Sequence, residues 1–507
     1  MAELRVIVVG AGMGGLAAAA DLARRGARVT VLDRAAAPGG KMRRVEVDGA
    51  AGIDGGPTVF TMKWVFDGLF GDAGRRVEDA LTLTRAGILA RHAWRRGGRL
   101  DLFADRERSA EAIGDFAGAR DAAGYRALCK RSADIYRTLV GPFIASERPS
   151  QFDLVQRVGL GNIGALVRTT PFATLWSALG EHFSDPRLRQ LFARYATYVG
   201  CSPFAAPATL MLIAHVEQEG VWLVDGGMRR VAEAVRDLAT AQGATFRFGA
   251  EVRRIHVLRG RAAGVELADG ERIEADAVVF NGAPDALAAG LLGEAARPAA
   301  APVPRDQRTL SAVTLCLDAP TEGFDLDHHN VFFAEDYAAE FDAIFRRRAI
   351  VAAPTVYLCA QDRGGETRPA PGTRERMLLL VNAPPDGDRA EPDAADVAQR
   401  AFALTEACGL RIRVEDGASV ATTPAGFHAL FPGTGGALYG RLGHGFGGSF
   451  ARPGARTPIP GLYLAGGGVH PGPGVPMATM SGRLAAARLL EDRAGRPRRV
   501  IALPVGR

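Results

Sequence analysis

The strongest constraint on the fold of this chain is its N-terminal stretch, RVIVVGAGMGGLAAAADLARRGARVTVLDR. The apolar run at residues 4–9 is typical of a buried parallel strand. A glycine turn at residues 10–15 spells G-x-G-x-x-G, and residues 16–25 then have helical composition. A second strand is predicted at residues 27–32. This order predicts a Rossmann-like α/β unit that binds a dinucleotide.

The glycines and the acid that follows them suit the parts of such a ligand. Gly10 makes the tight turn, Gly12 lets the backbone approach a pyrophosphate, and Gly15 allows close packing of helix on strand. The helix N-terminus offers free N–H groups to the phosphates. Asp33 lies 23 residues after Gly10, where it can accept hydrogen bonds from ribose hydroxyls and disfavour a 2′-phosphate. NADP is therefore not expected.

A second G-x-G-x-x-G occurs at Gly159, Gly161 and Gly164. No strand-like run precedes it and no second strand follows, so we predict a break between two helices there. The chain is expected to hold one nucleotide site.

Two further glycine turns follow the first unit, at residues 39–41 and 54–58. A plain NAD domain does not need them, whereas a larger bent cofactor does. Lys41 is one of three lysines among 62 basic residues, and it can neutralise pyrophosphate or flavin charge. Near the C-terminus, residues 466–476 contain eight glycines and prolines before an alanine-rich helical stretch. This turn predicts a rigid backbone held against a flat or charged group.

Together these motifs resemble the flavin-dependent carotenoid desaturases of the bacterial phytoene desaturase family, which is similar in fold to the amine oxidases. Two middle segments, Trp222–Ala239 and Gly249–Pro284, resemble the family as well. Within it, residues 56–70 and 88–105 look most like the 1-hydroxycarotenoid 3,4-desaturases, also called methoxyneurosporene dehydrogenases. The resemblance implies FAD as the cofactor. It also implies an α/β fold, in which a Rossmann-like FAD-binding domain of the amine oxidase type carries an inserted α+β substrate domain.

The resemblance also implies domain boundaries and FAD contacts. The FAD-binding domain is expected to be discontinuous, at residues 1–104, 222–299 and 451–507, with the substrate domain at 105–221 and 300–450. The expected cofactor-binding residues are Gly10, Gly12, Gly14, Gly15, Asp33, Lys41, Pro57, Thr58, Val252, Asn281, Gly467, Gly474, Val475, Pro476 and Met477. In particular, backbone N–H groups at 475–477 and the helix dipole would face the pyrimidine edge of the flavin. The chain departs from the family pattern by having Asp33 for Glu, Lys41 for Arg and Val469 for Thr.

The expected reaction removes two hydrogens from neighbouring carbons, one as a hydride to the flavin and one as a proton. No catalytic acid or base is assigned, and His470 is interpreted as structural. The nine histidines show no metal-ligand spacing, because the adjacent His328 and His329 should point different ways, so no metal is expected. Trp64 and Phe204 are core residues in the simplest interpretation, although they could line a tunnel.

Charge and composition bear on partners and location. The net charge is +6 and the pI about 9.3, yet no aromatic-and-basic motif of nucleic-acid binding appears. No apolar stretch reaches the ~18 residues of a membrane span, and the five cysteines show no metal or disulfide pattern. We therefore expect a cytoplasmic protein that associates peripherally with the membrane, where a carotenoid resides. The electron acceptor, oxygen or quinone, stays open.

Three alternatives to a carotenoid desaturase remain at the level of sequence. An amine oxidase shares the fold, and a carotenoid cis–trans isomerase shares fold and cofactor without net oxidation. A flavin-free escort protein for prenyl lipids also shares the fold, but the intact fingerprint argues against it.

Overall fold

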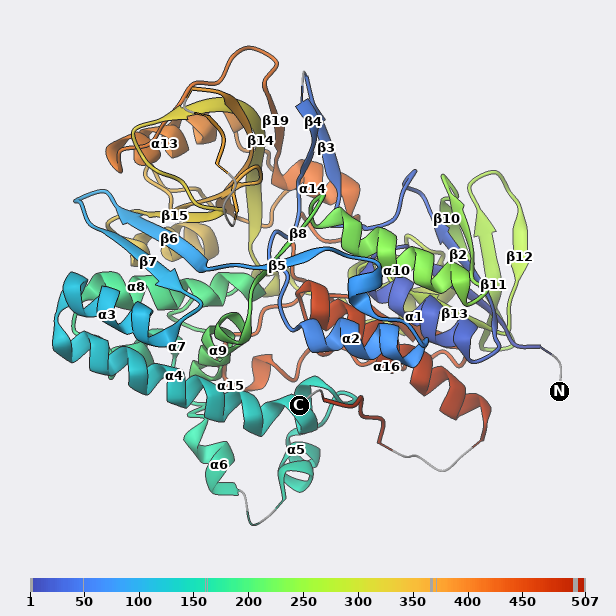
Figure 1. Ribbon diagram of the computed structural model, residues 1–507. Helices are drawn as coiled ribbons and strands as arrows, with labels where there is room; N and C mark the ends of the chain where they lie inside the picture. The colour runs from blue at the N-terminus through green and yellow to red at the C-terminus, as the bar shows by residue number, and fades with distance from the viewer. Residues whose placement is uncertain are drawn as a thin grey trace.

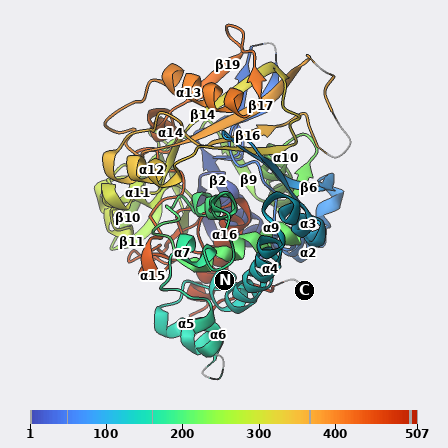
Figure 2. The ribbon, with the colours of Figure 1, turned by 90° about the vertical axis from the view of Figure 1, so that its left-hand side faces the viewer.

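The computed structural model describes residues 3–48, 50–159, 161, 163–364, 368–370, 372–495 and 500–505. Two large sheets lie side by side, and a lobe of helices extends below them (Figure 1). Seen after a quarter turn, helices α5 (Gln151–Val158) and α6 (Ile163–Arg168) again form the projecting tip of this lobe (Figure 2).

The first sheet is parallel and gathers its strands from distant parts of the chain. Its order is β20-β13-β1-β2-β9. The bounds are β1 Arg5–Val9, β2 Arg28–Asp33, β9 Thr245–Phe248, β13 Ala277–Phe280 and β20 Leu462–Leu464. Central strands such as β1 are buried on both faces, which explains their continuous apolar runs.

Helices α1 (Met13–Arg24), α10 (Arg229–Ala241) and α16 (Val475–Arg493) pack together against this sheet. Helix α1 begins directly after Gly12, three residues earlier than the predicted start at Leu16. The fingerprint glycines Gly14 and Gly15 therefore lie in its first turn. A three-stranded antiparallel sheet flanks the parallel one, with β10 at Val252–Leu258, β11 at Arg261–Leu267 and β12 at Arg272–Glu274.

The second sheet has eight strands and is antiparallel apart from the β6–β15 pair. Its order is β18-β14-β17-β16-β15-β6-β7, with β19 also paired to β14. The bounds are β6 Ile88–Trp94, β7 Arg99–Phe103, β14 Ser311–Glu322, β15 His329–Phe333, β16 Val356–Ala360, β17 Arg374–Ala383, β18 Arg411–Ile412 and β19 Ser419–Thr422. The apolar runs at residues 353–360 and 375–384 predict strands, and β16 and β17 coincide with them.

The helical lobe is built from residues 106–219. Its helices are α3 Arg106–Ala117, α4 Ala119–Leu139, α5, α6, α7 Leu175–Leu179, α8 Pro186–Ala193 and α9 Leu212–Glu219, with the 3₁₀ helix η4 at Arg194–Val199. The predicted break between helices is confirmed, because α5 ends at Val158 and α6 begins at Ile163.

Shorter elements complete the structure. The helices are α2 Lys63–Asp72, α11 Pro284–Ala288, α12 Tyr337–Asp342, α13 Ala394–Ala407, α14 Pro424–Leu430 and α15 Gly445–Gly448. Two short antiparallel strand pairs accompany them: β3 (Arg44–Val47) pairs with β4 (Ala50–Asp54), and β5 (Leu83–Arg85) pairs with β8 (Trp222–Val224).

The strand pairing differs from the expected domain boundary at residue 104. Strands β6 and β7 lie within the predicted FAD-binding segment 1–104, but they belong to the second sheet, in which β6 pairs with β15 and β7 pairs with β6. Sequence position could not show this, because a strand joins the sheet whose edge it reaches rather than the sheet of its neighbours in sequence. Residues 1–2, 49, 496–499 and 506–507 of the predicted FAD-binding domain lie outside the described residues.

Candidate functional site

One continuous cavity of about 2200 Å³ runs between the parallel sheet, the eight-stranded sheet and the helical lobe. Ordinary small-molecule pockets measure roughly 300–1,000 Å³, so this space exceeds the needs of a single small ligand. Fourteen of the fifteen sequence-predicted cofactor residues line it: Gly10, Gly12, Gly14, Asp33, Lys41, Pro57, Thr58, Val252, Asn281, Gly467, Gly474, Val475, Pro476 and Met477.

The fingerprint turn forms one end of the cavity, and its glycines are required by close contacts. Gly15, the fifteenth predicted cofactor-binding residue, does not line the cavity and packs behind the turn instead. A Cβ added to Gly15 would lie 2.0 Å from the carbonyl oxygen of Gly10. A Cβ on Gly14 would lie 2.6 Å from Oδ1 of Asn281 and 2.7 Å from the backbone nitrogen of Gly466. Gly10 has a φ of +101°, which side chains rarely adopt.

Asp33 closes the fingerprint turn from the end of β2. Its Oδ2 accepts a hydrogen bond from the backbone N–H of Ala11 at 2.6 Å, and its Oδ1 accepts one from Ala35 at 2.7 Å. A carboxylate has room for further hydrogen bonds, and Asp33 lines the cavity. The predicted contact with ribose hydroxyls is compatible with this position and stays a prediction.

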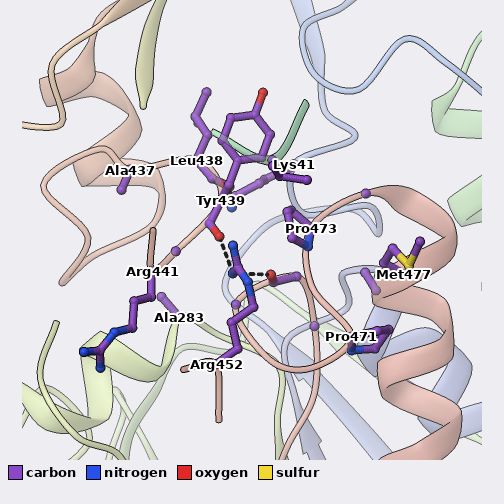
Figure 3. A pocket seen from close by; sticks show the side chains of 18 of the residues that line it. Lys41, Ala283, Ala437, Leu438, Tyr439, Arg441, Arg452, Pro471, Pro473 and Met477 are labelled. Carbon is purple, nitrogen blue, oxygen red and sulfur yellow. Dashed lines mark hydrogen bonds between the residues drawn. The ribbon is translucent and has the colours of Figure 1, made fainter. Parts of the chain in front are cut away.

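Two cations face the cavity, the half-buried Lys41 and the buried Arg452. Lys41 Nζ donates to the carbonyl oxygen of Leu438, and Arg452 donates to those of Tyr439 at 2.6 Å and Gly467 at 3.4 Å (Figure 3). Neither cation forms a salt bridge with any acid in the described part of the chain.

Burial disfavours both charges. It lowers the pKa of Lys41 to about 8, with a further contribution from the positive charge of Arg452, and it lowers the pKa of Arg452 to about 10. Two uncompensated cations in one cavity call for an anionic ligand, and the diphosphate or flavin of FAD supplies that charge. The residues present therefore fit FAD. Arg452 was missed by the sequence reasoning, because its approach to Lys41 exists only in three dimensions.

The closing glycine-proline turn lies where the sequence predicted it, beside the fingerprint. Gly474 has a φ of +114° and precedes α16, whose N-terminus at Val475 opens onto the cavity. Figure 3 shows Pro471 and Pro473 on this turn and Met477 on the first turn of α16, with Pro473 toward the guanidinium of Arg452. The exposed N–H groups of the first helical turn are suited to a negatively charged edge of a ring.

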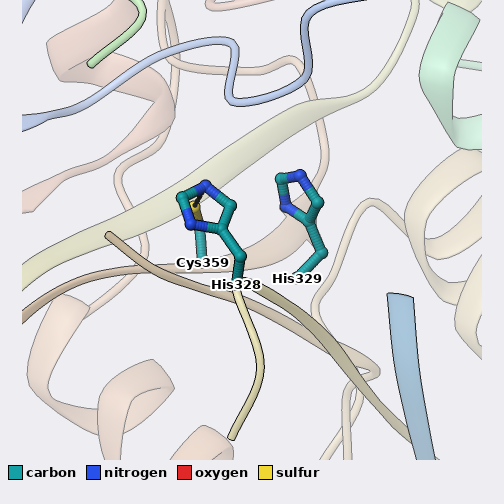
Figure 4. Close-up of side chains that lie close together, drawn as sticks. All are labelled: His328, His329 and Cys359. Carbon is teal, nitrogen blue, oxygen red and sulfur yellow. Dashed lines mark hydrogen bonds between the residues drawn. The ribbon is translucent and has the colours of Figure 1, made fainter. Parts of the chain in front are cut away.

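Thr58 connects this end of the cavity to the second sheet. Its hydroxyl lies 2.7 Å from the hydroxyl of Tyr357 on β16, which lies 2.8 Å from Nδ1 of His329. The rings of His328 and His329 approach to 4.6 Å between centroids, and Cys359 lies beside them (Figure 4).

The expectation that these adjacent histidines diverge is wrong, because His328 precedes β15 and is not bound by the alternation of a strand. One potential ligand atom from each of these three residues lies within 4.8 Å of the others. His328 Nδ1 lies 2.5 Å from the Arg363 carbonyl oxygen and its Nε2 lies 3.5 Å from Cys359 Sγ, so ordinary hydrogen bonds account for the group.

His470 and the aromatic residues follow the structural interpretation. Nε2 of His470 is 2.9 Å from the carbonyl oxygen of Phe143 and 3.0 Å from that of Ser146, and burial lowers its pKa to about 4. Trp64 and Phe204 pack against the hydrophobic cores rather than along the cavity.

A parallel sheet whose glycine turns, cations and closing helix N-terminus converge on one large cavity defines a flavoprotein of the FAD-binding oxidoreductase class. Residues 13–490 match the model of the family described as flavin containing amine oxidoreductase. The chain belongs to this family and, within it, to the bacterial carotenoid desaturases. It binds FAD.

Relatives cover the chain almost completely. The chain is 54% identical to a hydroxyneurosporene desaturase of Rubrivivax gelatinosus, with 98% of this chain and 95% of the relative aligned. It is 45% identical to the hydroxyneurosporene desaturase of Cereibacter sphaeroides, with 97% and 99% aligned.

Among solved structures, a redesigned triple mutant of putrescine oxidase has a TM-score of 0.59 at 16% identity, covering 97% of this chain and all of that one. Cyclohexylamine oxidase from Brevibacterium oxydans has a TM-score of 0.55 at 18% identity, covering 97% of this chain and all of that one. These two similarities show the fold alone.

Proposed function

We propose that this protein is an FAD-dependent carotenoid desaturase, which introduces a carbon–carbon double bond into an acyclic carotenoid bearing a 1-hydroxy or 1-methoxy group. The observation that carries the proposal is the single cavity, which joins the FAD-binding turns to a long space walled by apolar side chains. The two hydroxyneurosporene desaturases, aligned over nearly their whole length, support the same class of substrate.

The apolar part of the cavity suits a polyene. Its wall includes Leu139, Val155, Leu210, Ile213 and Val216 from the helical lobe and Val331, Leu378 and Leu380 from the second sheet. Such a surface excludes water and holds a rigid hydrocarbon by contact area.

The chemistry divides between cofactor and protein. FAD, when bound, supplies the acceptor for the hydride that leaves the substrate. The protein's own part is to orient the polyene along the cavity, keep water out, and hold positive charge at Lys41 and Arg452 near the cofactor.

The cavity opens at the tip of the helical lobe, where large apolar side chains are exposed. Phe152 on α5 is 70% exposed, Val167 on α6 is 67% exposed and Phe172 just beyond α6 is 81% exposed, and all three line the cavity. Two exposed arginines, Arg148 and Arg168, lie in the same region. No described helix combines the length and the apolar character that a bilayer crossing requires.

From these features we infer that the tip docks on an anionic lipid surface and admits the polyene from it. Apolar side chains flanked by arginines are typical of such docking. The protein would then work on the cytoplasmic face of the membrane and pass electrons to oxygen or a membrane quinone.

The proposal is tested by anaerobic incubation of the purified holoprotein with hydroxyneurosporene, followed by product spectra. Desaturation shifts the polyene absorption to the red and bleaches the flavin, since one conjugated double bond is added as electrons reach the cofactor. A cis–trans isomerase would change the spectrum without net reduction of FAD. Unchanged substrate with oxidised flavin contradicts the proposal.

A further inference from the structure

The apolar cavity contains one charged cluster that the cofactor does not explain. Arg194 and Tyr198 on η4 and Glu217 on α9 all line the cavity. Arg194 is 6% exposed and Glu217 is 4% exposed, so both charges are removed from water. A hydrocarbon substrate alone gives no reason to place charges in this wall.

The cluster is ordered by short hydrogen bonds. Arg194 Nη1 donates to the hydroxyl of Tyr198 at 2.6 Å, and that hydroxyl donates to Glu217 Oε1 at 2.8 Å. Tyr195 donates to Glu217 Oε2 at 2.7 Å from the side away from the cavity. Although burial opposes its charge, Tyr198 and Glu217 raise the pKa of Arg194, so it stays protonated.

Arg194 keeps unused hydrogen-bond donors. Its Nε is buried without a hydrogen-bond partner, and among the described residues its nearest acid, Glu217, is reached only through the hydroxyl of Tyr198. A guanidinium with free donors at the wall of a dry cavity can bind an oxygen atom of the ligand.

The cluster lies toward the FAD end of the cavity. Helix η4, which carries Arg194 and Tyr198, is capped at Gly200, where an added Cβ would lie 2.5 Å from the ring of Tyr439. The carbonyl oxygen of Tyr439 accepts a hydrogen bond from Arg452, the cation expected to face the cofactor. An oxygen held at this cluster would therefore be close to the carbons that react.

We propose that Arg194, positioned by Tyr198 and Glu217, is the subsite for the oxygen-bearing end of the carotenoid. This rests on the proposed function and deepens it. Arg194 donates to the oxygen of either a hydroxyl or a methyl ether, while Glu217 and Tyr198 can accept the hydrogen of a hydroxyl. A polyene without that oxygen leaves the donor of Arg194 unpaired, and so the cluster selects against it.

The test compares kcat/KM for hydroxyneurosporene and for neurosporene, which lacks the hydroxyl. The matched variants are Tyr198→Phe and Tyr195→Phe. Each removes one hydroxyl that donates a hydrogen bond to the Glu217 carboxylate, but only Tyr198 lines the cavity. Arg194→Met removes the donor itself. Variants are accepted when FAD content and circular dichroism match the wild type.

We expect Arg194→Met to lower kcat/KM for hydroxyneurosporene by about 10- to 150-fold, the loss of one hydrogen bond to a charged group, with little change for neurosporene. Tyr198→Phe should lower kcat/KM for hydroxyneurosporene by about 2- to 10-fold, and Tyr195→Phe should leave kcat/KM for hydroxyneurosporene unchanged. Where Arg194→Met does not fold, the two tyrosine variants decide.

The subsite is overturned if Tyr198→Phe and Arg194→Met leave kcat/KM for hydroxyneurosporene unchanged relative to kcat/KM for neurosporene. It is also overturned if Tyr195→Phe lowers kcat/KM for hydroxyneurosporene as much as Tyr198→Phe does. A wild type that oxidises neither polyene contradicts the proposed function instead. The two failures are therefore distinguishable.

Discussion

Gly482 on the last helix lies directly against Gly14 on the first. A Cβ added to Gly482 would lie 1.9 Å from the carbonyl oxygen of Gly14 and 3.0 Å from the backbone nitrogen of Ala18. The two motifs that define the FAD end of the cavity are thus held together by backbone contact between α1 and α16, across almost the whole length of the chain.

Gly482→Ala is expected to separate these helices and to weaken FAD binding. The clash is with backbone, which cannot rotate away, so overpacking should lower the free energy of unfolding by about 1–3 kcal/mol. Urea denaturation and the ratio of flavin to protein absorbance measure both effects. Gly71→Ala is the control, because Gly71 is exposed near the end of α2 with open space around its Cβ, and the change should be neutral or slightly stabilising. Equal FAD retention in the two variants would show that the α1–α16 contact does not govern the site.

Gly12→Val should abolish FAD binding while the protein remains folded. Its Cβ would already lie 2.9 Å from Nδ2 of Asn281, and the branches would occupy space at the cavity wall, where a pyrophosphate is expected. The yellow colour of the purified protein reports the loss. Gly87→Val is the matched control, because nothing lies within 4 Å of its Cβ. Normal flavin content in Gly12→Val would mean that the turn has only a structural role.

FAD affinity should fall as the pH rises above about 8, because Lys41 then loses its proton in the protein without cofactor. The pKa of Lys41 is depressed below its unfolded value, so the unfolded chain binds more protons between about pH 8 and 10.5, and the apoprotein gains stability from Lys41 as pH rises through that window. Lys41→Met should bind FAD more weakly below pH 8. It should also lose the pH dependence of FAD affinity and that of apoprotein stability.

The measurement is FAD titration of apoprotein from pH 6.5 to 9.5, with thermal unfolding in parallel. Lys63→Met is the control, since Lys63 pairs with Asp67 and Glu78 on the surface. A wild-type affinity that is flat across this range would exclude Lys41 as a charge partner of the cofactor.

The double variant Phe152→Ser with Phe172→Ser should bind anionic liposomes about 10- to 100-fold more weakly, because it removes apolar area from the tip of the lobe. High salt should weaken wild-type binding only in part, because the arginines contribute the screened fraction. Flotation at low and high salt measures both. Leu258→Ser is the control, since Leu258 is 63% exposed on β10 and does not line the cavity. Full turnover of liposomal carotenoid by protein that never floats would contradict docking.

The local motifs of the site could be predicted from the sequence because each depends on short-range stereochemistry. Gly10 and Gly15 must be glycine for reasons within six residues of chain, and the strand and helix around them follow from apolar runs and composition. The same holds for the turn before α16, where glycine and proline fix the backbone at Gly474. Resemblance to a family then linked these separate motifs to one cofactor.

Only the tertiary structure decided which side chains meet. Arg452 faces the same cavity as Lys41, and the hydroxyl of Tyr357 contacts that of Thr58, across long separations in sequence. Tyr198 links Arg194 on one helix to Glu217 on another. Strands β6 and β7 join the second sheet although they follow the first FAD motifs in sequence. These contacts depend on how sheets and helices pack around a shared cavity, and local sequence periodicity records which face of an element is buried without recording what it is buried against.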